Sequence, residues 1–89
     1  MAARIFSMAS NRSDLLKTFE RTAAEVAERA FANVSESTQI SELGIDSLGM
    51  LEIIGSLERE LAIRIPDEAL AGIQTVKDLL NAVESRQNA

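Results

Sequence analysis

The chain has 89 residues, of which 46% are hydrophobic, and it carries a net charge of −5. This length predicts a single domain, and the apolar content is that of a globular protein rather than a disordered one. The sequence has neither cysteine nor histidine. It therefore cannot form disulfides, thiolate or imidazole metal sites, or a catalytic triad that depends on histidine.

The negative charge is concentrated in the middle of the chain. Residues 1–34 hold five basic and four acidic residues, whereas residues 35–70 hold two basic and eight acidic ones, and residues 71–89 are balanced. An acidic surface of this kind argues against binding to nucleic acid or to an anionic membrane. It suits a protein partner that presents a basic patch. Hydrophobic runs stay well short of the ~20 residues that span a bilayer.

Residues 1–12 are expected to form a disordered leader. They include Arg4 and Arg12 and no acidic residue, but the stretch is too short for a transit peptide and its apolar part is too short for a secretory signal. We therefore expect an untargeted, cytoplasmic protein.

Residues 13–32 show the spacing of an amphipathic helix. Asn11 or Ser13 can cap its start, Asp14 lies in the first turn where the helix dipole favours an acid, and Asn33 can end it in a left-handed conformation. Glu25 and Arg29 have the i,i+4 spacing of an ion pair. The apolar face comprises Leu15, Leu16, Phe19, Ala23, Val26, Ala27 and Ala30.

Residues 33–46 predict a long loop, because their apolar residues are spaced irregularly among Ser, Thr and Glu. Val34, Ile40, Leu43 and Ile45 are expected to plug the core. Loops of this length without structure are uncommon and often functional.

Residues 47–61 predict a second helix. One arc holds Leu48, Glu52, Gly55, Ser56 and Arg59, with Leu51 and Glu58 at the border. A mid-helix glycine costs about 1 kcal/mol relative to alanine, so Gly55 calls for close helix packing or a close partner. The opposite arc, which should face the core, comprises Met50, Ile53, Ile54, Leu57 and Leu61.

The rest of the chain predicts an extended segment and two further helices. Pro66 forces the preceding residue out of α geometry and can open a short third helix at its first position, which Gly72 ends. Thr75 is expected to cap a fourth helix together with Asp78, before a frayed tail at 86–89. Its apolar face comprises Val76, Leu79, Leu80 and Val83. The fold class is therefore all-α, a four-helix bundle over residues 13–85 with a long loop between the first two helices.

Ser47, at the start of the second helix, is the main candidate for chemistry. A serine in this position is most often an N-cap, and without histidine it cannot be a hydrolase nucleophile. Its hydroxyl can still be modified, because the helix N-terminus favours an attached phosphate. Asp46 next to it can hydrogen-bond locally or meet a metal or a basic group on a modifying enzyme. We expect no metal site: a calcium loop starting at Asp46 would have Leu48 and Met50 where oxygen ligands are needed.

The stretches SELGIDSLGMLEI and RIPDEALAGIQTV, at about residues 41–76, resemble the acyl carrier proteins of fatty acid and polyketide synthesis. The order of the helices extends the resemblance from about residue 13 over nearly the whole chain. The resemblance implies a monomeric carrier without catalytic residues, in which a phosphopantetheinyl transferase attaches 4′-phosphopantetheine to Ser47. The thiol of this arm would hold acyl groups as thioesters.

The resemblance also assigns roles to neighbouring residues. Asp46 and Leu48 would flank Ser47 for the transferase, and Leu51, Glu52 and Glu58 would dock partners such as a ketosynthase or an acyltransferase. Acyl chains could enter a cavity lined by residues such as Met50, Ile53, Ile54 and Leu57. Gly49, Gly55 and Arg59 depart from the more acidic members of the family, which favours a specialised pathway.

Two alternatives remain open from the sequence. A peptidyl or aryl carrier protein of a nonribosomal peptide pathway would use the same serine for an amino or aryl acid. A helical adaptor that is never modified would leave Ser47 as a capping residue alone.

Overall fold

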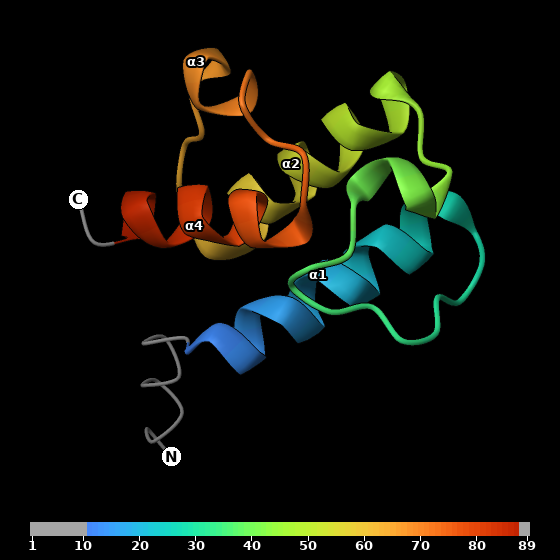
Figure 1. The fold of residues 1–89 in the computed structure, drawn as a ribbon. Helices are drawn as coiled ribbons and strands as arrows, with labels where there is room; N and C mark the ends of the chain where they lie inside the picture. Colours follow the sequence, from blue (N-terminus) through green and yellow to red (C-terminus); the bar gives the residue numbers. More distant parts are fainter. Residues whose placement is uncertain (1–10, 88–89) are drawn as a thin grey trace.

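The structure is helical, as the sequence predicts (Figure 1). It is a computed structural model that describes residues 11–87. Within that range no helix is long and apolar enough to cross a bilayer. The elements in chain order are α1 (Arg12–Ala27), the 3₁₀ helix η2 (Ile40–Leu43), α2 (Ser47–Leu61), α3 (Asp67–Leu70) and α4 (Val76–Gln87).

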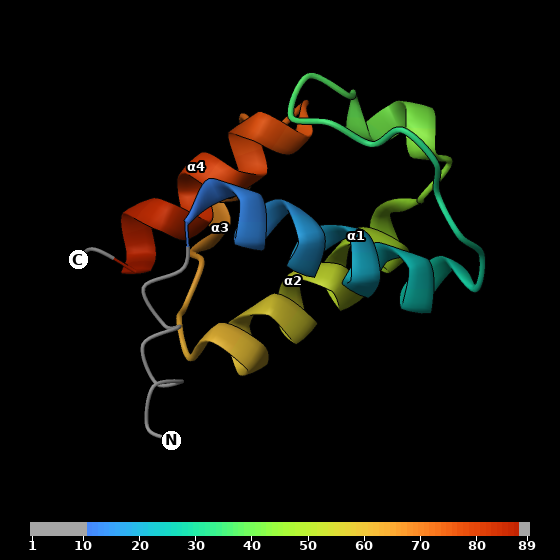
Figure 2. The same ribbon diagram turned by 90° about the horizontal axis from the view of Figure 1, so that it is seen from below.

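Helix α1 packs against both α2 and α4, and the short α3 packs on α4. Figures 1 and 2 both place the start of α1 beside the end of α4. Arg12 connects these ends: its guanidinium lies 3.1 Å from the Glu84 carboxylate and 2.7 Å from that of Glu36 in the loop. Its hydrogen bonds to Glu36 lower the pKa of that carboxyl and raise the pKa of Arg12 itself. One arginine thus joins three segments.

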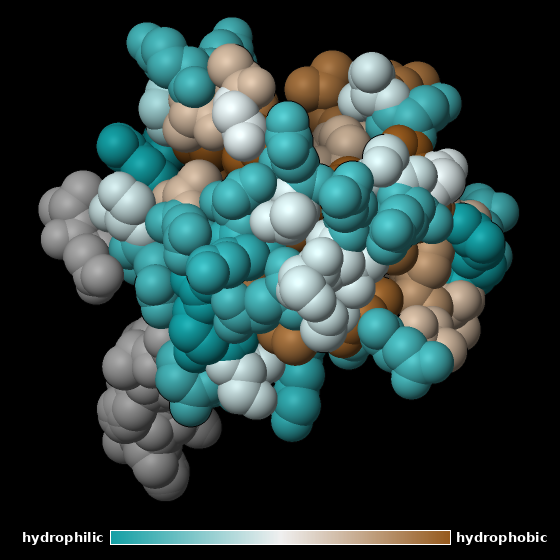
Figure 3. Space-filling model, in the orientation of Figure 1, coloured by the Kyte–Doolittle hydropathy of each residue, from teal (hydrophilic) through white to brown (hydrophobic). Residues whose placement is uncertain are grey.

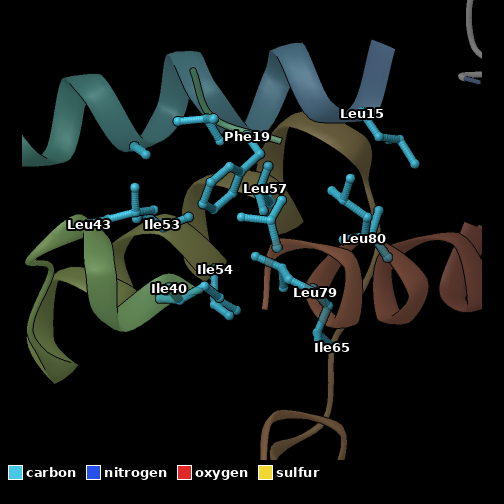
Figure 4. Close-up of a cluster of buried hydrophobic side chains, with 14 residues drawn as sticks. Leu15, Phe19, Ile40, Leu43, Ile53, Ile54, Leu57, Ile65, Leu79 and Leu80 are labelled. Carbon is cyan, nitrogen blue, oxygen red and sulfur yellow. The ribbon is translucent and has the colours of Figure 1, made fainter. Parts of the chain in front are cut away.

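The hydrophobic core lies between α1, α2, α4 and η2 (Figure 4). Phe19 of α1, Ile53 of α2 and Leu79 of α4 are completely shielded from solvent. Burying such a side chain stabilises the fold by about 1.5–3 kcal/mol. The predicted apolar face of α4 is buried throughout, and the loop residues Val34, Ile40 and Leu43 do enter the core.

The predicted end of the first helix is wrong. Helix α1 ends at Ala27 rather than at residue 32, because Glu28 takes a left-handed conformation (φ 58°) and closes the helix with its N–H on the carbonyl of Ala24. Asn33 is left-handed as well (φ 60°), but it stands in the loop. Arg29 therefore leaves the helix, and among the described residues it forms no ion pair with Glu25.

The long loop is more ordered than the sequence predicts. It contains η2, and its backbone is pinned to the start of α4 by three hydrogen bonds. Ile40 N–H donates to the carbonyl of Gln74, Val76 N–H to that of Thr38, and Lys77 N–H to that of Glu36, over 2.8–3.0 Å. The sequence pattern does not show these bonds, because their partners are far apart along the chain.

The boundaries of the last two helices need correction. Pro66 is the N-cap of α3 rather than its first residue, and α3 ends at Leu70, before Gly72. Helix α4 continues to Gln87, past residue 85, and Arg86 donates to the carbonyl of Arg64 over 2.9 Å. Residues 1–10 and 88–89, which include most of the expected leader, lie outside the described residues.

The expected cap of α4 is present. Asp78 N–H donates to the hydroxyl of Thr75, and Thr75 N–H donates back to the Asp78 carboxylate, each over 3.1 Å. Backbone N–H groups of Gln74 and Thr75 stabilise the charged form of this carboxylate and so lower the pKa of Asp78.

Candidate functional site

The cap of α2 is Asp46, not Ser47. Asp46 has an extended backbone, and its Oδ1 accepts a hydrogen bond from Gly49 N–H over 2.8 Å. Its carbonyl also accepts from Met50 N–H over 2.9 Å. One of the otherwise unpaired N–H groups at the helix start is thereby satisfied. The sequence allowed a capping role for Ser47, and the structure gives that role to its neighbour.

Ser47 is the first residue of α2, and it is exposed. In the part of the chain that the structure describes, its hydroxyl takes part in none of the side-chain hydrogen bonds. The hydroxyl stands at the positive end of the α2 dipole, where a phosphate is favoured. A phosphate ester at this position can therefore form without breaking any hydrogen bond of the fold.

Two glycines shape the turn that leads into Ser47. Gly44 is left-handed (φ 71°), a conformation that residues with a Cβ rarely adopt. Gly49 is buried, and a Cβ there would lie 2.7 Å from Cγ2 of Ile45 and 3.2 Å from Oδ1 of Asp46. Residue 49 must therefore be small so that the turn can close onto the helix. The sequence marked Gly49 only as a departure from the family pattern.

Arg29 helps to position the backbone that leads to Ser47, a role that the sequence did not reveal. Its guanidinium donates to the carbonyl of Leu43 and lies 4.7 Å from the centre of the Phe31 ring. The contact with Leu43 secures the backbone just before Gly44, where the turn to Ser47 begins. The helical spacing assigned Arg29 to α1, so no local signal pointed to this contact.

A groove of about 730 Å³ opens beside Ser47. Figure 3 shows it as a notch between α3 and the start of α2, with hydrophobic residues gathered on the α2 side. Of the predicted cavity residues, Met50 and Ile54 line the groove, whereas Ile53 and Leu57 are buried in the core. The full lining is Gln39, Ile40, Ser41, Ile45, Asp46, Ser47, Met50, Leu51, Ile54, Leu70, Ile73 and Gln74.

The predicted docking residues do not share one environment. Leu48 and Leu51 are 65% and 60% exposed, and Glu52 is exposed on the same side of α2. Glu58 is only half-exposed, and its Oε2 accepts a hydrogen bond from Ile65 N–H over 2.8 Å. Its carboxylate thus holds the segment after α2 in place. This internal role makes Glu58 a weaker docking candidate than Glu52.

The comparison with known families is decisive. Residues 17–83 match the family model described as "Phosphopantetheine attachment site". The chain belongs to the acyl carrier protein family. It is 36% identical to an acyl carrier protein of Helicobacter hepaticus over 76 residues, which are 81% of this chain and all of that protein. It is 38% identical to one of Clostridium perfringens over 69 residues, 73% of this chain and 91% of the relative.

The fold agrees with a solved acyl carrier protein as well. The crystal structure of the acyl carrier protein of Thermotoga maritima matches with a TM-score of 0.80 and 32% sequence identity, covering 86% of this chain and 91% of that one. Acyl carrier proteins bear a covalently attached 4′-phosphopantetheine. A phosphopantetheinyl transferase modifies them, and they interact with acyl-processing enzymes.

Proposed function

We propose that Ser47 carries the 4′-phosphopantetheine and that the chain shuttles acyl thioesters between enzymes of fatty acid or polyketide synthesis in the cytoplasm. The observation that supports this most directly is the exposed Ser47 hydroxyl at the start of α2, freed from capping by Asp46.

In the attachment reaction, this chain presents the Ser47 hydroxyl to the transferase. The Ser47 oxygen forms a bond to the phosphorus of coenzyme A that carries the pantetheine, the pyrophosphate bond breaks, and adenosine 3′,5′-bisphosphate leaves. The serine proton goes to a base of the transferase. The attached group supplies a terminal thiol, which a chain without cysteine does not have.

The groove supports a role in sheltering the acyl chain. It begins at Ser47 and continues along apolar side chains of α2 and of the α3 region, namely Met50, Leu51, Ile54, Leu70 and Ile73. Apolar surface of an acyl chain gains about 25 cal/mol per Å² when it leaves water. Besides Asp46 and Ser47, the polar residues that line the groove are Gln39, Ser41 and Gln74.

The exposed side of α2 supports docking next to the attachment point. Leu48 and Leu51 offer apolar contact, and Glu52 offers a negative charge that steers encounter with a basic group. A peptidyl or aryl carrier would use the same serine and differs in the acid that its loading enzyme delivers. An unmodified adaptor would gain nothing from a free Ser47 hydroxyl.

Intact mass spectrometry tests the proposal. The purified chain is incubated with coenzyme A, magnesium and a broad-specificity phosphopantetheinyl transferase, beside Ser47→Ala and the control Ser41→Ala, which alters another exposed serine of the same groove. We expect one phosphopantetheine on the wild type and the control and none on Ser47→Ala. Since the Ser47 hydroxyl caps nothing, Ser47→Ala should change the stability by less than about 0.5 kcal/mol. A folded wild type that gains no mass, or a modified Ser47→Ala, refutes the assignment.

A further inference from the structure

The outward side of α2 carries a continuous stripe of five residues, which we call the α2 stripe: Leu48, Leu51, Glu52, Gly55 and Arg59. Their spacing of three and four residues places them on one face of the helix. Among residues 11–87, the exposed large hydrophobic side chains are Leu48 and Leu51. Paired apolar residues exposed beside a functional serine mark an interaction surface.

The charge of the stripe is balanced, although α2 itself is acidic. Of the three glutamates in α2, Glu58 binds the backbone N–H of Ile65, and Glu60 forms an ion pair with Arg21 of α1. Only Glu52 and Arg59 remain to face a partner. Neither belongs to a salt bridge among the described residues.

Arg59 turns back along the helix toward the middle of the stripe. Its Nη2 donates to the hydroxyl of Ser56 over 3.2 Å, and its Nη1 lies 3.6 Å from the place that a Cβ on residue 55 would occupy. The guanidinium therefore lies over Gly55. It keeps most of its hydrogen-bond donors available, in the planar arrangement that matches a carboxylate.

Packing within residues 11–87 does not explain the glycine at position 55. Apart from Nη1 of Arg59, nothing in the described structure comes within 4 Å of the position of its missing Cβ. A glycine in the middle of a helix lowers stability by about 1 kcal/mol relative to alanine. The close helix packing that the sequence allowed is therefore ruled out, and a close partner remains.

We propose that the α2 stripe docks an acyl-processing enzyme whose contact patch has mixed charge, with a carboxylate facing Arg59 over Gly55, a basic group facing Glu52 and an apolar side chain seated on Leu48 and Leu51. The proposal rests on the proposed function. Residues 52 and 59 lie about 10 Å apart along the helix axis, but the Arg59 guanidinium turns back over Gly55, so the partner's two charges should lie closer together than that. A uniformly basic patch would attract Glu52 and repel Arg59, and the stripe thus discriminates against it.

The test uses a coenzyme A analogue whose thiol is replaced by an electrophile, so that the transferred arm crosslinks to the nucleophile of a condensing enzyme. Each condensing enzyme encoded by the source organism is tried, and the one that the wild type labels fastest is used. The variants are Arg59→Glu, Glu52→Lys and Gly55→Ala. Arg64→Glu is the control, because it makes the same change of charge at an exposed residue beyond α2.

Arg59→Glu should slow crosslinking at least about tenfold, Glu52→Lys should slow it as well, and Arg64→Glu should leave it within about twofold. Exchanging the partner's facing carboxylate for lysine should restore the rate for Arg59→Glu. Gly55→Ala should slow crosslinking although its fold is more stable, which separates docking from folding.

The proposal is overturned if Arg59→Glu reacts as fast as the wild type or faster, or if no condensing enzyme is labelled. It is also overturned if sedimentation shows that Arg59 instead joins two copies of the chain. Intact mass is measured first on every variant. A failure of arm attachment refutes the proposed function, whereas normal attachment with unchanged crosslinking refutes only the docking proposal.

Discussion

Two glycines in α2 should respond oppositely to the same substitution. Gly49 and Gly55 lie in one helix, six residues apart, and replacing either with alanine gains about 1 kcal/mol of helix propensity. What differs is the space around the new Cβ. The pair therefore tests the local geometry and uses each variant as the control for the other.

At Gly55 the new methyl group would meet, among the residues that the structure describes, only Nη1 of Arg59, at an ordinary contact distance of 3.6 Å. Nothing offsets the propensity gain, so Gly55→Ala should stabilise the fold by about 1 kcal/mol. For a domain of this size that corresponds to a rise in Tm of about 4–8 °C.

At Gly49 the new methyl group would lie 2.7 Å from Cγ2 of Ile45 and 3.2 Å from Oδ1 of Asp46. Overpacking of this kind costs about 1–3 kcal/mol, and displacing the Asp46 carboxylate from its cap costs about 1 kcal/mol more. After the propensity gain, Gly49→Ala should lose about 1–3 kcal/mol. It should also slow modification of Ser47, because the turn before the serine must move.

Urea and thermal unfolding followed by far-UV circular dichroism measure both stabilities, and transferase kinetics report on Ser47. We expect the two variants to differ by about 2–4 kcal/mol. The reasoning fails if Gly49→Ala is stabilised as much as Gly55→Ala, since Ile45 would then not be held against the helix. It fails equally if Gly55→Ala is destabilised.

Two further predictions concern the core and the pH dependence. Ile53→Ala removes a fully buried side chain of α2 and should lower the free energy of unfolding by about 2–5 kcal/mol. Leu51→Ala, at a position that is 60% exposed, should lower it by less than about 1 kcal/mol. Equal losses of stability would contradict the assignment of Ile53 to the buried face of α2 and of Leu51 to the exposed one. The pKa values of Glu36 and Asp78 are lowered, by Arg12 and by backbone N–H groups respectively. Carboxylates with lowered pKa values stabilise the fold above the pKa of the unfolded chain, and this contribution is lost as the pH falls through the folded-state value. The Tm should therefore fall below about pH 4. Asp78→Asn should have a lower Tm than the wild type at neutral pH and approach it in acid, and a gap that stays constant with pH would contradict this origin.

The sequence alone was sufficient for the helical framework. Helix α2 occupies the predicted range, and the apolar spacing of α4 identified a face that is buried throughout. The cap of α4 by Thr75 and Asp78 was also predictable. These features depend on residues three or four positions apart, and such spacings are visible in the sequence because the helix repeats every 3.6 residues.

The site could be predicted only in part. The stretch around Ser47 indicated the family, which the comparisons confirm, and Leu48 and Leu51 are exposed as their helical positions imply. The capping role of Asp46 was not distinguished from that of Ser47, since both are good caps by residue type. Only the backbone conformation, extended at Asp46 and helical from Ser47, decides between them.

Contacts between distant residues were decided by the tertiary structure. Arg29 binds the carbonyl of Leu43 across 14 positions, and Arg21 pairs with Glu60 across 39. The Glu58 carboxylate accepts a hydrogen bond from Ile65 N–H and is therefore not free for docking. A local pattern shows which residues are charged and which side of a helix they share. It does not show which of those charges find a partner inside the fold, because that depends on how the helices pack against one another. The charges left facing outward, Glu52 and Arg59, therefore became evident only once the packing was known.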